Sequence, residues 1–332
     1  MGYRIAINGY GRIGRSVMRA IIERADTQAV EVVAINQPGD PNSIALATRY
    51  DSNHGRIQMP VSAGKNSLTI GGQTITVLPG VAASECPWQQ LDVDLVLDCS
   101  GQAANRDQAN AHLAAGADKV LYSNPATKDV DATIIGGFNA HVLSAKDRII
   151  SAGSCTTNCL VPLLSEIDAS FGIRHGGSTT LHAAMNDQPV SDTIQQGRAA
   201  LNAMIPIDTA LATGVARLLP ALSGKIECTH IRVPTTNVSA MDISLNLNQS
   251  VSAEQLNAHF ARLAAERWHG VINVNTDPVS SVDFNHDAHS GIIDLRQTRA
   301  ADSGFAKILC WFDNEWGFSN RMVDITLRLA HA

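Results

Sequence analysis

A glycine-rich turn near the N-terminus constrains the fold of this chain more than any other feature. Gly9, Gly11 and Gly14 have the spacing G-x-G-x-x-G, between a short apolar strand pattern at 4–7 and an apolar-periodic helix pattern at 13–22. In this context the glycines let the backbone approach a pyrophosphate, which then lies at the N-terminus of the helix. The turn therefore predicts a dinucleotide-binding unit at the start of the chain.

Strand and helix patterns alternate over the first 150 residues. After the turn, the predicted elements are strands at 31–35, 93–98 and 119–122, a helix at 103–115, and a hairpin of 68–70 and 74–77. This alternation is typical of a parallel sheet with crossover helices. The second strand leads into Gln37, where a dinucleotide fold usually offers a carboxylate to the adenosine ribose. Because an amide does not repel a 2′-phosphate, both NAD and NADP stay open as cofactors.

The pattern changes to long strands after Gly172. Apolar and polar residues alternate over 241–248, which is the period of a sheet buried on one face. We therefore predict an α/β protein: a Rossmann-type doubly wound parallel sheet at 1–153, followed by an α+β domain with a mostly antiparallel sheet at 154–315. A C-terminal helix at 316–332 is expected to complete the first domain.

Composition narrows the possible functions. The chain has 332 residues, which is long enough for two domains with a core each. Its hydrophobic content of 45% is typical of globular proteins, and its formal net charge is -6. The acidic balance and the lack of a basic block argue against nucleic acid and anionic membranes as partners. No apolar run is long enough for a membrane span or a signal peptide, so we expect a cytoplasmic protein. Six cysteines without framework spacing predict free thiols, and we expect no metal.

A cysteine at the predicted start of a helix is the candidate nucleophile. Ser154 is a good N-cap residue, Cys155 falls in the first turn, and Gly172 closes the helix. At such a position the helix dipole favours the thiolate, which is the nucleophilic form of cysteine. Cysteine more often packs as a small buried hydrophobe, and we interpret Cys159 in this way. Cys155 qualifies as a nucleophile only if the chain also supplies a base and a substrate site.

Four motifs together resemble the glyceraldehyde-3-phosphate dehydrogenase family. They occur in the family's order and are Asn8–Arg15, Ser154–Cys159, Arg232–Thr235 and Asp313–Gly317. The resemblance covers the whole chain. Further stretches look more like one branch of the family, the erythrose-4-phosphate dehydrogenases, and these are 50–56, 185–188, 283–287 and 297–299.

The resemblance implies an NAD-dependent aldehyde dehydrogenase that works through a thioester. By similarity, Cys155 attacks the aldehyde and His182 acts as general base. The implied cofactor-binding residues are Gly9, Gly11, Arg12, Ile13, Gly14, Gln37, Ser123 and Asn314, of which the last would orient the nicotinamide. The implied substrate-binding residues are Ser154, Thr156 and Thr209 in one anion site and Arg232 in the other. The implied partners are a small phosphorylated aldose and further copies of the chain, as a homotetramer.

The chain departs from the glyceraldehyde enzymes near the predicted base. Met185 and Asp187 stand where those enzymes have two threonines, which favours a longer substrate such as D-erythrose 4-phosphate. The same change weakens the case for inorganic phosphate as acyl acceptor, so we expect water to release 4-phospho-D-erythronate. The segment between His182 and Pro206 is also shorter than usual, which puts the usual tetramer contacts in question. Two alternatives stay open: a phosphorylating glyceraldehyde-3-phosphate dehydrogenase, and a weakly active nicotinamide-binding regulatory protein.

Overall fold

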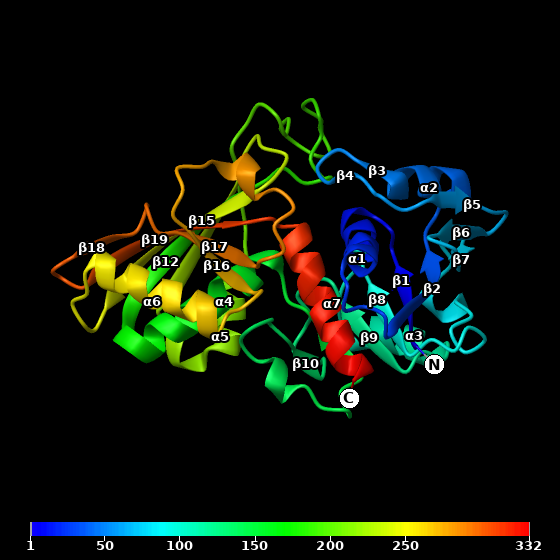
Figure 1. Cartoon of the computed structure of the whole chain (residues 1–332), viewed down its shortest axis with the longest axis horizontal. Coiled ribbons are helices and arrows are strands. Elements are labelled where there is room, and N and C mark those ends of the chain that lie inside the picture. Colours follow the sequence, from blue (N-terminus) through cyan, green and yellow to red (C-terminus); the bar gives the residue numbers. More distant parts are fainter. Residues whose placement is uncertain (1, 332) are drawn as a thin grey trace. The chain divides into compact units, whose positions relative to one another are not determined.

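The computed structural model describes residues 2–331, which form two compact units. The first unit contains the described residues up to Ser154 and those from Ser319 onward, and the second contains Cys155–Phe318. Each unit is built on its own large sheet (Figure 1). Helix α7 (Trp316–Ala330) begins in the second unit and continues along the chain into the first.

The first unit carries a nine-stranded sheet in the order β10-β11-β9-β8-β1-β2-β7-β6-β5. The strands and helices of this unit are β1 (Tyr3–Asn8), α1 (Arg12–Glu23), β2 (Val30–Asn36), α2 (Pro41–Arg49), β3 (Tyr50–Asp51), β4 (Gly55–Arg56), β5 (Val61–Ala63), β6 (Ser67–Ile70), β7 (Gln73–Leu78), β8 (Leu95–Asp98), α3 (Arg106–Ala114), β9 (Lys119–Tyr122), β10 (Ala132–Thr133) and β11 (Ile149–Ser151). Strands β3 and β4 form a separate two-stranded sheet. Short 3-10 turns lie at Ala83–Glu85 and Ala140–Val142.

The centre of this sheet is parallel, as the alternation of strands and helices predicted. Strand β1 pairs in parallel with β2 on one side and β8 on the other, so the strand order reverses at β1. In such sheets, ligands bind beyond the carboxyl ends of the strands at this point of reversal. The predicted hairpin is also confirmed, with Gly71 and Gly72 both at positive φ between β6 and β7. Helix α3 starts later than predicted because Asn105 accepts a hydrogen bond from Gln108 N–H and caps it.

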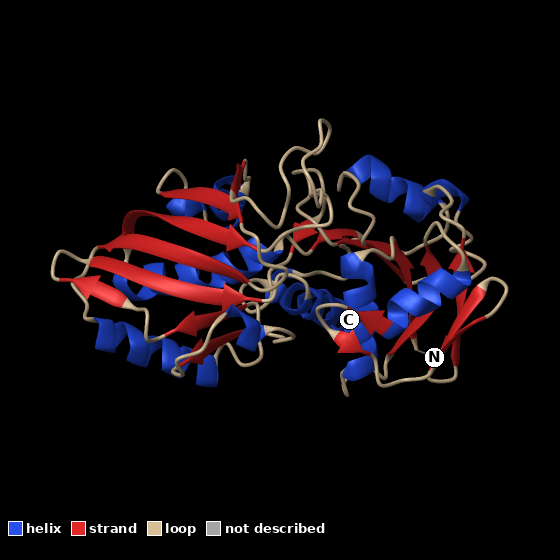
Figure 2. Ribbon diagram, turned by 90° about the horizontal axis from the view of Figure 1, so that it is seen from above, coloured by secondary structure: helices blue, strands red, loops and turns tan. Residues whose placement is uncertain are grey.

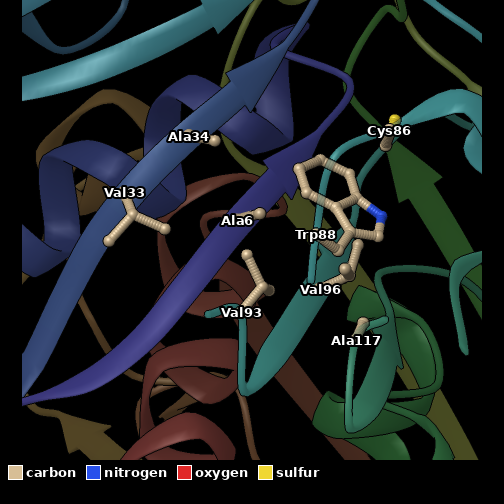
Figure 3. Packing of buried hydrophobic residues seen from close by; sticks show 8 residues of the cluster. All are labelled: Ala6, Val33, Ala34, Cys86, Trp88, Val93, Val96 and Ala117. Carbon is tan, nitrogen blue, oxygen red and sulfur yellow. The ribbon is translucent and has the colours of Figure 1, made fainter. Parts of the chain in front are cut away.

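A buried tryptophan links the core of the first unit to the end of β8. Trp88 is fully buried in the hydrophobic cluster that Figure 3 shows, among side chains that include Val96 and Cys86. Its indole N–H donates to His112 Nδ1 at 3.0 Å, and His112 Nε2 lies 3.2 Å from Asp98 Oδ2. Because buried polar groups are costly when unpaired, this chain of contacts fixes Asp98 at the carboxyl end of the sheet.

The second unit carries an eight-stranded sheet in the order β13-β14-β12-β15-β19-β17-β16, with β18 paired to β19. Its elements before α7 are α4 (Cys155–Phe171), β12 (Ile173–His182), β13 (Ile205–Ile207), α5 (Leu211–Leu218), β14 (Ile226–Arg232), β15 (Ser239–Leu247), α6 (Ala253–Glu266), β16 (Ile272–Asn275), β17 (Gly291–Asp294), β18 (Arg299–Ala301) and β19 (Phe305–Phe312). Short 3-10 turns lie at Pro220–Leu222 and Ser281–Phe284.

The sheet of the second unit is mostly antiparallel, as predicted, but two of its strand pairs are parallel: β12 with β14, and β16 with β17. The ribbon in Figure 2 shows these long strands side by side. Helices α4, α5 and α6 lie on one face of the sheet (Figure 1). Strand β15 confirms the predicted alternation, because Met241, Ile243 and Leu245 are buried while the polar residues between them are partly exposed. Within residues 2–331, the structure contains no helix long and apolar enough to cross a membrane.

Candidate active site

The structure places the candidate nucleophile beside the candidate base. Cys155 is the first residue of α4, and Gly172 follows the last residue of that helix with a positive φ of 67°, as predicted. His182 is the last residue of β12. Cys155 Sγ lies 3.7 Å from His182 Nε2, within reach of a thiol hydrogen bond. Residues that are far apart in the sequence are thus brought together as a thiol–imidazole dyad.

The hydrogen bonds of His182 determine which of its ring nitrogens can act as a base. His182 Nδ1 lies 2.7 Å from the carbonyl oxygen of Ala183. A carbonyl only accepts, so Nδ1 carries the proton of the neutral ring and Nε2 presents a lone pair to Cys155. Burial lowers the pKa of His182, and the Arg232 guanidinium lowers it further, against opposing effects of the Ala183 bond and nearby carboxylates. At neutral pH the imidazole is therefore in its basic form.

The resting state of Cys155 differs from the expectation that the helix terminus yields a thiolate. Burial of the sulfur, together with the carboxylates of Asp313 and Glu315, raises the pKa of Cys155 to about 12. Backbone N–H groups of Cys155 and Thr156 lower the pKa, as expected at a helix start, but they do not compensate for burial. The thiol is therefore protonated at neutral pH, and His182 Nε2 is the neighbouring group that could accept its proton.

A continuous set of hydrogen bonds connects the base to Asn314. The backbone N–H of Ala183 donates to Ser239 Oγ at 3.0 Å, and Ser239 Oγ donates to Asn314 Oδ1 at 2.8 Å. Asp313 holds the same loop, because its carboxylate accepts from the N–H groups of Glu315 and Trp316. With its oxygen already bonded, Asn314 has its amide N–H groups left as donors.

Arg232 lies next to the base but is paired with a carboxylate. It is the register partner of His182 in the parallel β12–β14 pair, which places both side chains on one face of the sheet. Arg232 Nη1 donates to Asp187 Oδ1 at 2.7 Å, and the buried Arg232 Nε has no hydrogen-bond partner. Sequence reasoning singled out both residues but did not predict this ion pair, because nothing in the sequence brings 187 and 232 together.

The hydroxyl candidates lie at the starts of two helices that pack against each other, α4 and α5. Thr156 is buried in the first turn of α4, directly after Cys155, and Ser154 precedes that helix. Thr209 Oγ1 accepts a hydrogen bond from Leu211 N–H at 3.2 Å, at the start of α5. Its hydroxyl proton stays available for an anion.

Sequence reasoning missed one histidine at this site. The ring of His230 stacks on that of His182, with centroids 4.9 Å apart and an interplanar angle of 21°. His230 lies two residues before Arg232 on β14, so the two side chains share a face of the sheet. This period-2 relation is the sequence signal that could have placed His230 beside the base.

The glycine-rich turn of the first unit has the shape that a pyrophosphate needs. Gly9 has a φ of +87°, and a Cβ there would lie 2.5 Å from the backbone of Ser100. A Cβ on Gly14 would lie 2.2 Å from the carbonyl oxygen of Gly9, whereas one on Gly11 would have no atom within 4 Å. Gly11 precedes α1 without any side-chain cap. The first N–H groups of α1 and the open side of Gly11 thus fit a bound phosphate group.

The other cofactor candidates surround the same end of the sheet. Gln37 follows β2, and its Oε1 accepts a hydrogen bond from Tyr10 N–H at 2.6 Å. Ser123 follows β9 and donates its backbone N–H to the carbonyl oxygen of Asp98 at 3.0 Å. Arg12 starts α1, with Ile13 after it, and forms an ion pair with Asp51. These positions fit a dinucleotide lying along the carboxyl ends of the central strands.

No group of three or more metal-binding side chains is found among residues 2–331. The two histidines of the 285–289 segment have other contacts. The ring of His286 stacks on Trp316, and His289 Nδ1 lies 2.6 Å from Asp287 Oδ1.

Comparison with protein-family models gives two matches that together span most of the chain. Residues 3–106 match the NAD binding domain of glyceraldehyde 3-phosphate dehydrogenase, and residues 154–314 match its C-terminal domain. The chain belongs to the glyceraldehyde-3-phosphate dehydrogenase family. The first match contains the glycine-rich turn, and the second contains the Cys155 and His182 pair.

Membership in the glyceraldehyde-3-phosphate dehydrogenase family establishes the type of reaction. The protein is an NAD-dependent dehydrogenase that acts on a phosphorylated aldehyde. Its Rossmann-type unit binds NAD. The matched models describe the family and not one of its branches, so a proposal for the aldehyde has to rest on the residues around Cys155.

Proposed function

We propose that the protein oxidises D-erythrose 4-phosphate to 4-phospho-D-erythronate, with NAD as oxidant and a thioester at Cys155 as intermediate. The contact between Cys155 Sγ and His182 Nε2 at 3.7 Å carries the chemical part of this proposal. The ion pair between Asp187 and Arg232 supports the choice of substrate.

The dyad can perform each proton transfer of the reaction. His182 Nε2 takes the thiol proton while Sγ adds to the aldehyde carbon, and the resulting imidazolium donates to the new hemithioacetal oxygen. NAD, when bound, accepts the hydride from that carbon. His182 removes the hydroxyl proton as the carbonyl reforms, which leaves a thioester at Cys155, and the imidazolium then loses this proton to solvent. Asn314, with its N–H groups free to donate, is proposed to hold the nicotinamide carboxamide.

Asp187 supports the longer substrate. In a tetrose 4-phosphate, one more hydroxylated carbon separates the aldehyde from the phosphate than in glyceraldehyde 3-phosphate. A carboxylate accepts hydrogen bonds from hydroxyl groups but repels phosphate, so Asp187 suits a site where hydroxyls lie near it and the phosphate lies further away. Arg232, whose Nη1 is bonded to Asp187, is the proposed partner of that phosphate through the guanidinium N–H groups that the carboxylate leaves unused.

The same carboxylate supports water as the acyl acceptor. Asp187 neutralises part of the charge on Arg232, which lies beside His182, and its carboxylate repels inorganic phosphate. Water meets no such repulsion and can be deprotonated by His182 Nε2. Hydrolysis of the thioester then gives the carboxylate product and regenerates the Cys155 thiol.

Formation of NADH with two aldehydes tests the proposal. D-Erythrose 4-phosphate and D-glyceraldehyde 3-phosphate are compared, each with and without inorganic phosphate. We expect higher kcat/KM for the erythrose substrate and little effect of phosphate. A requirement for phosphate together with a preference for the triose would instead establish the glycolytic type of reaction. NAD binding without turnover of either aldehyde would favour a regulatory nicotinamide-binding protein.

We also propose that the protein is a homotetramer, as its family membership suggests. The loops between His182 and β13 expose apolar side chains, with Val190 81%, Ile194 98% and Met204 73% accessible. Large apolar side chains exposed in one segment are typical of an interaction surface. Light scattering after size exclusion should give four copies, and Ile194→Asp should shift the protein to smaller species. A monomer in both cases would contradict the proposal.

A further inference from the structure

His182 is held by contacts on several sides, of which the stack with His230 is the closest ring contact. The edge of Phe312 faces the ring of His182 in a T-shaped arrangement, with centroids 6.5 Å apart. The ring of His230 covers a face of His182 at 4.9 Å. The carbonyl oxygen of Ala183 binds His182 Nδ1 and holds the ring on a third side. Rotation of the imidazole away from Cys155 would break the stack and the hydrogen bond together.

The surroundings of His230 keep its ring uncharged. Its Nε2 is buried and has no hydrogen-bond partner. Burial, together with the neighbouring His182 and Arg232, lowers the pKa of His230 to about 4. A proton on His230 would add an unpaired charge next to these two groups.

The unpaired Nε2 of His230 argues against a hydrogen-bonding role for this side chain. Thr180, the register partner of His230 on β12, also has a buried hydroxyl without a hydrogen-bond partner. A side chain kept for hydrogen bonding at position 230 would use one of its nitrogens for that neighbour. The contact that His230 does make is with a ring, so the role of the side chain lies in its flat, uncharged surface.

We propose that His230 is a positioning residue for the general base: its neutral ring holds His182 in the plane in which Nε2 faces Cys155 Sγ, and it stabilises the imidazolium that forms there. The inference rests on the proposed role of His182 as base. The proton moves only from Cys155 Sγ to His182 Nε2, and His230 neither gains nor loses one. A flat π-system beside a new cation is favourable, whereas a second imidazolium would repel it.

Two substitutions separate the ring of His230 from its nitrogens. His230→Phe keeps a flat ring and removes the unpaired nitrogen, while His230→Gln keeps a polar side chain and removes the ring. The readout is the rate at which iodoacetamide alkylates Cys155, measured by mass spectrometry over a range of pH without aldehyde or NAD. His175→Gln is the matched control, because His175 lies exposed on the same strand as His182.

We expect His230→Gln to slow alkylation near neutral pH about tenfold, as a misplaced base loses part of its usual contribution. His230→Phe should stay within about threefold of the wild type, and His175→Gln should match it. In turnover, kcat of the glutamine variant should fall with KM little changed. Melting curves of each variant show that it is folded.

Three results would overturn the inference. Alkylation at the wild-type rate in His230→Gln would show that the ring is dispensable, and a slow His230→Phe would show that a nitrogen is needed instead. A raised KM with unchanged kcat would assign His230 to substrate binding beside Arg232. His182→Asn, measured in parallel, separates this failure from that of the proposed function: if it too leaves alkylation unchanged, His182 is not the base.

Discussion

The two candidate sites of this protein are built in different ways. The cofactor turn is six consecutive residues whose backbone supplies the shape, and its glycines matter for the side chains they lack. The catalytic site joins side chains from four places in the second unit: the start of α4, the end of β12, the end of β14 and the loop after β19. Substitutions that add atoms to the glycine-rich turn should therefore impair cofactor binding. Substitutions that exchange functional groups should impair the site around Cys155.

The largest expected effect is on the side-chain site. Cys155→Ser should lower kcat at least about a thousandfold, because a hydroxyl is far less acidic than a thiol and forms no thioester. NAD affinity, measured by calorimetry, should change little, since the cofactor turn is untouched. Cys228→Ser is the control, because that partly buried thiol lies on β14 and bonds to Ser178. Turnover above one per cent of the wild type would show that another residue is the nucleophile.

The next largest effects are expected in the glycine-rich turn. Substitutions of Gly14 and Gly11 should act there in different ways. Gly14→Ala should destabilise the protein by about 2 kcal/mol or more, because its Cβ would overlap the carbonyl oxygen of Gly9. Gly11→Ala has room in the protein alone, so it should leave the melting temperature unchanged and weaken NAD binding instead. Equal melting temperatures and equal NAD affinities for both variants would show that the turn does not hold the pyrophosphate.

This difference also explains what could be predicted from the sequence. The turn at Gly9, the start of α4 at Cys155 and the alternation in β15 depend on neighbours along the chain, and the structure confirms all three. The Asp187–Arg232 ion pair depends on the path of the loop after β12, which no local pattern sets. The His230 stack depends on the pairing of β12 with β14, so the period-2 relation to Arg232 is informative only once that pairing is known. The raised pKa of Cys155 also depends on the tertiary structure, since burial of the sulfur outweighs the effect of the local helix terminus.

Substitution of Asp187 should change the substrate specificity of the side-chain site with little change in stability. Asp187→Asn keeps the size of a side chain that is 66% exposed, so the loss of its ion pair should cost under about 1 kcal/mol of stability. The preference for erythrose 4-phosphate over the triose should fall about tenfold, and inorganic phosphate should begin to accelerate turnover. Asp192→Asn is the matched control, because Asp192 pairs with Arg198 in the same loop segment. Identical changes in both variants would mean that Asp187 has no specific role.

The pH dependence of turnover should reflect the environment of His182. The base is active when neutral, and burial lowers its pKa, so it stays in the basic form to lower pH than an exposed histidine does. The acid limb of kcat/KM should therefore lie below the ordinary histidine pKa of about 6.5. Profiles of the wild type and of His182→Asn, recorded with a slow substrate so that chemistry limits the rate, provide the measurement. An acid limb above this value would mean that a different group controls it.

The smallest expected effect concerns a side chain that supports the backbone site. Gln37 Oε1 accepts from Tyr10 N–H, so the residue both fixes the glycine-rich turn and lies where the adenosine ribose is expected. Gln37→Asp places a negative charge there and repels the 2′-phosphate of NADP, so the preference for NAD over NADP should rise about fivefold. Gln37→Asn shortens the side chain equally without the charge, and it measures the cost of losing the bond to Tyr10. If both variants lose NAD affinity alike and their NAD to NADP ratios match the wild type, Gln37 only braces the turn. In that case the preference for NAD over NADP does not depend on the side chain at position 37, and the backbone of the turn is the main determinant of cofactor binding in this unit.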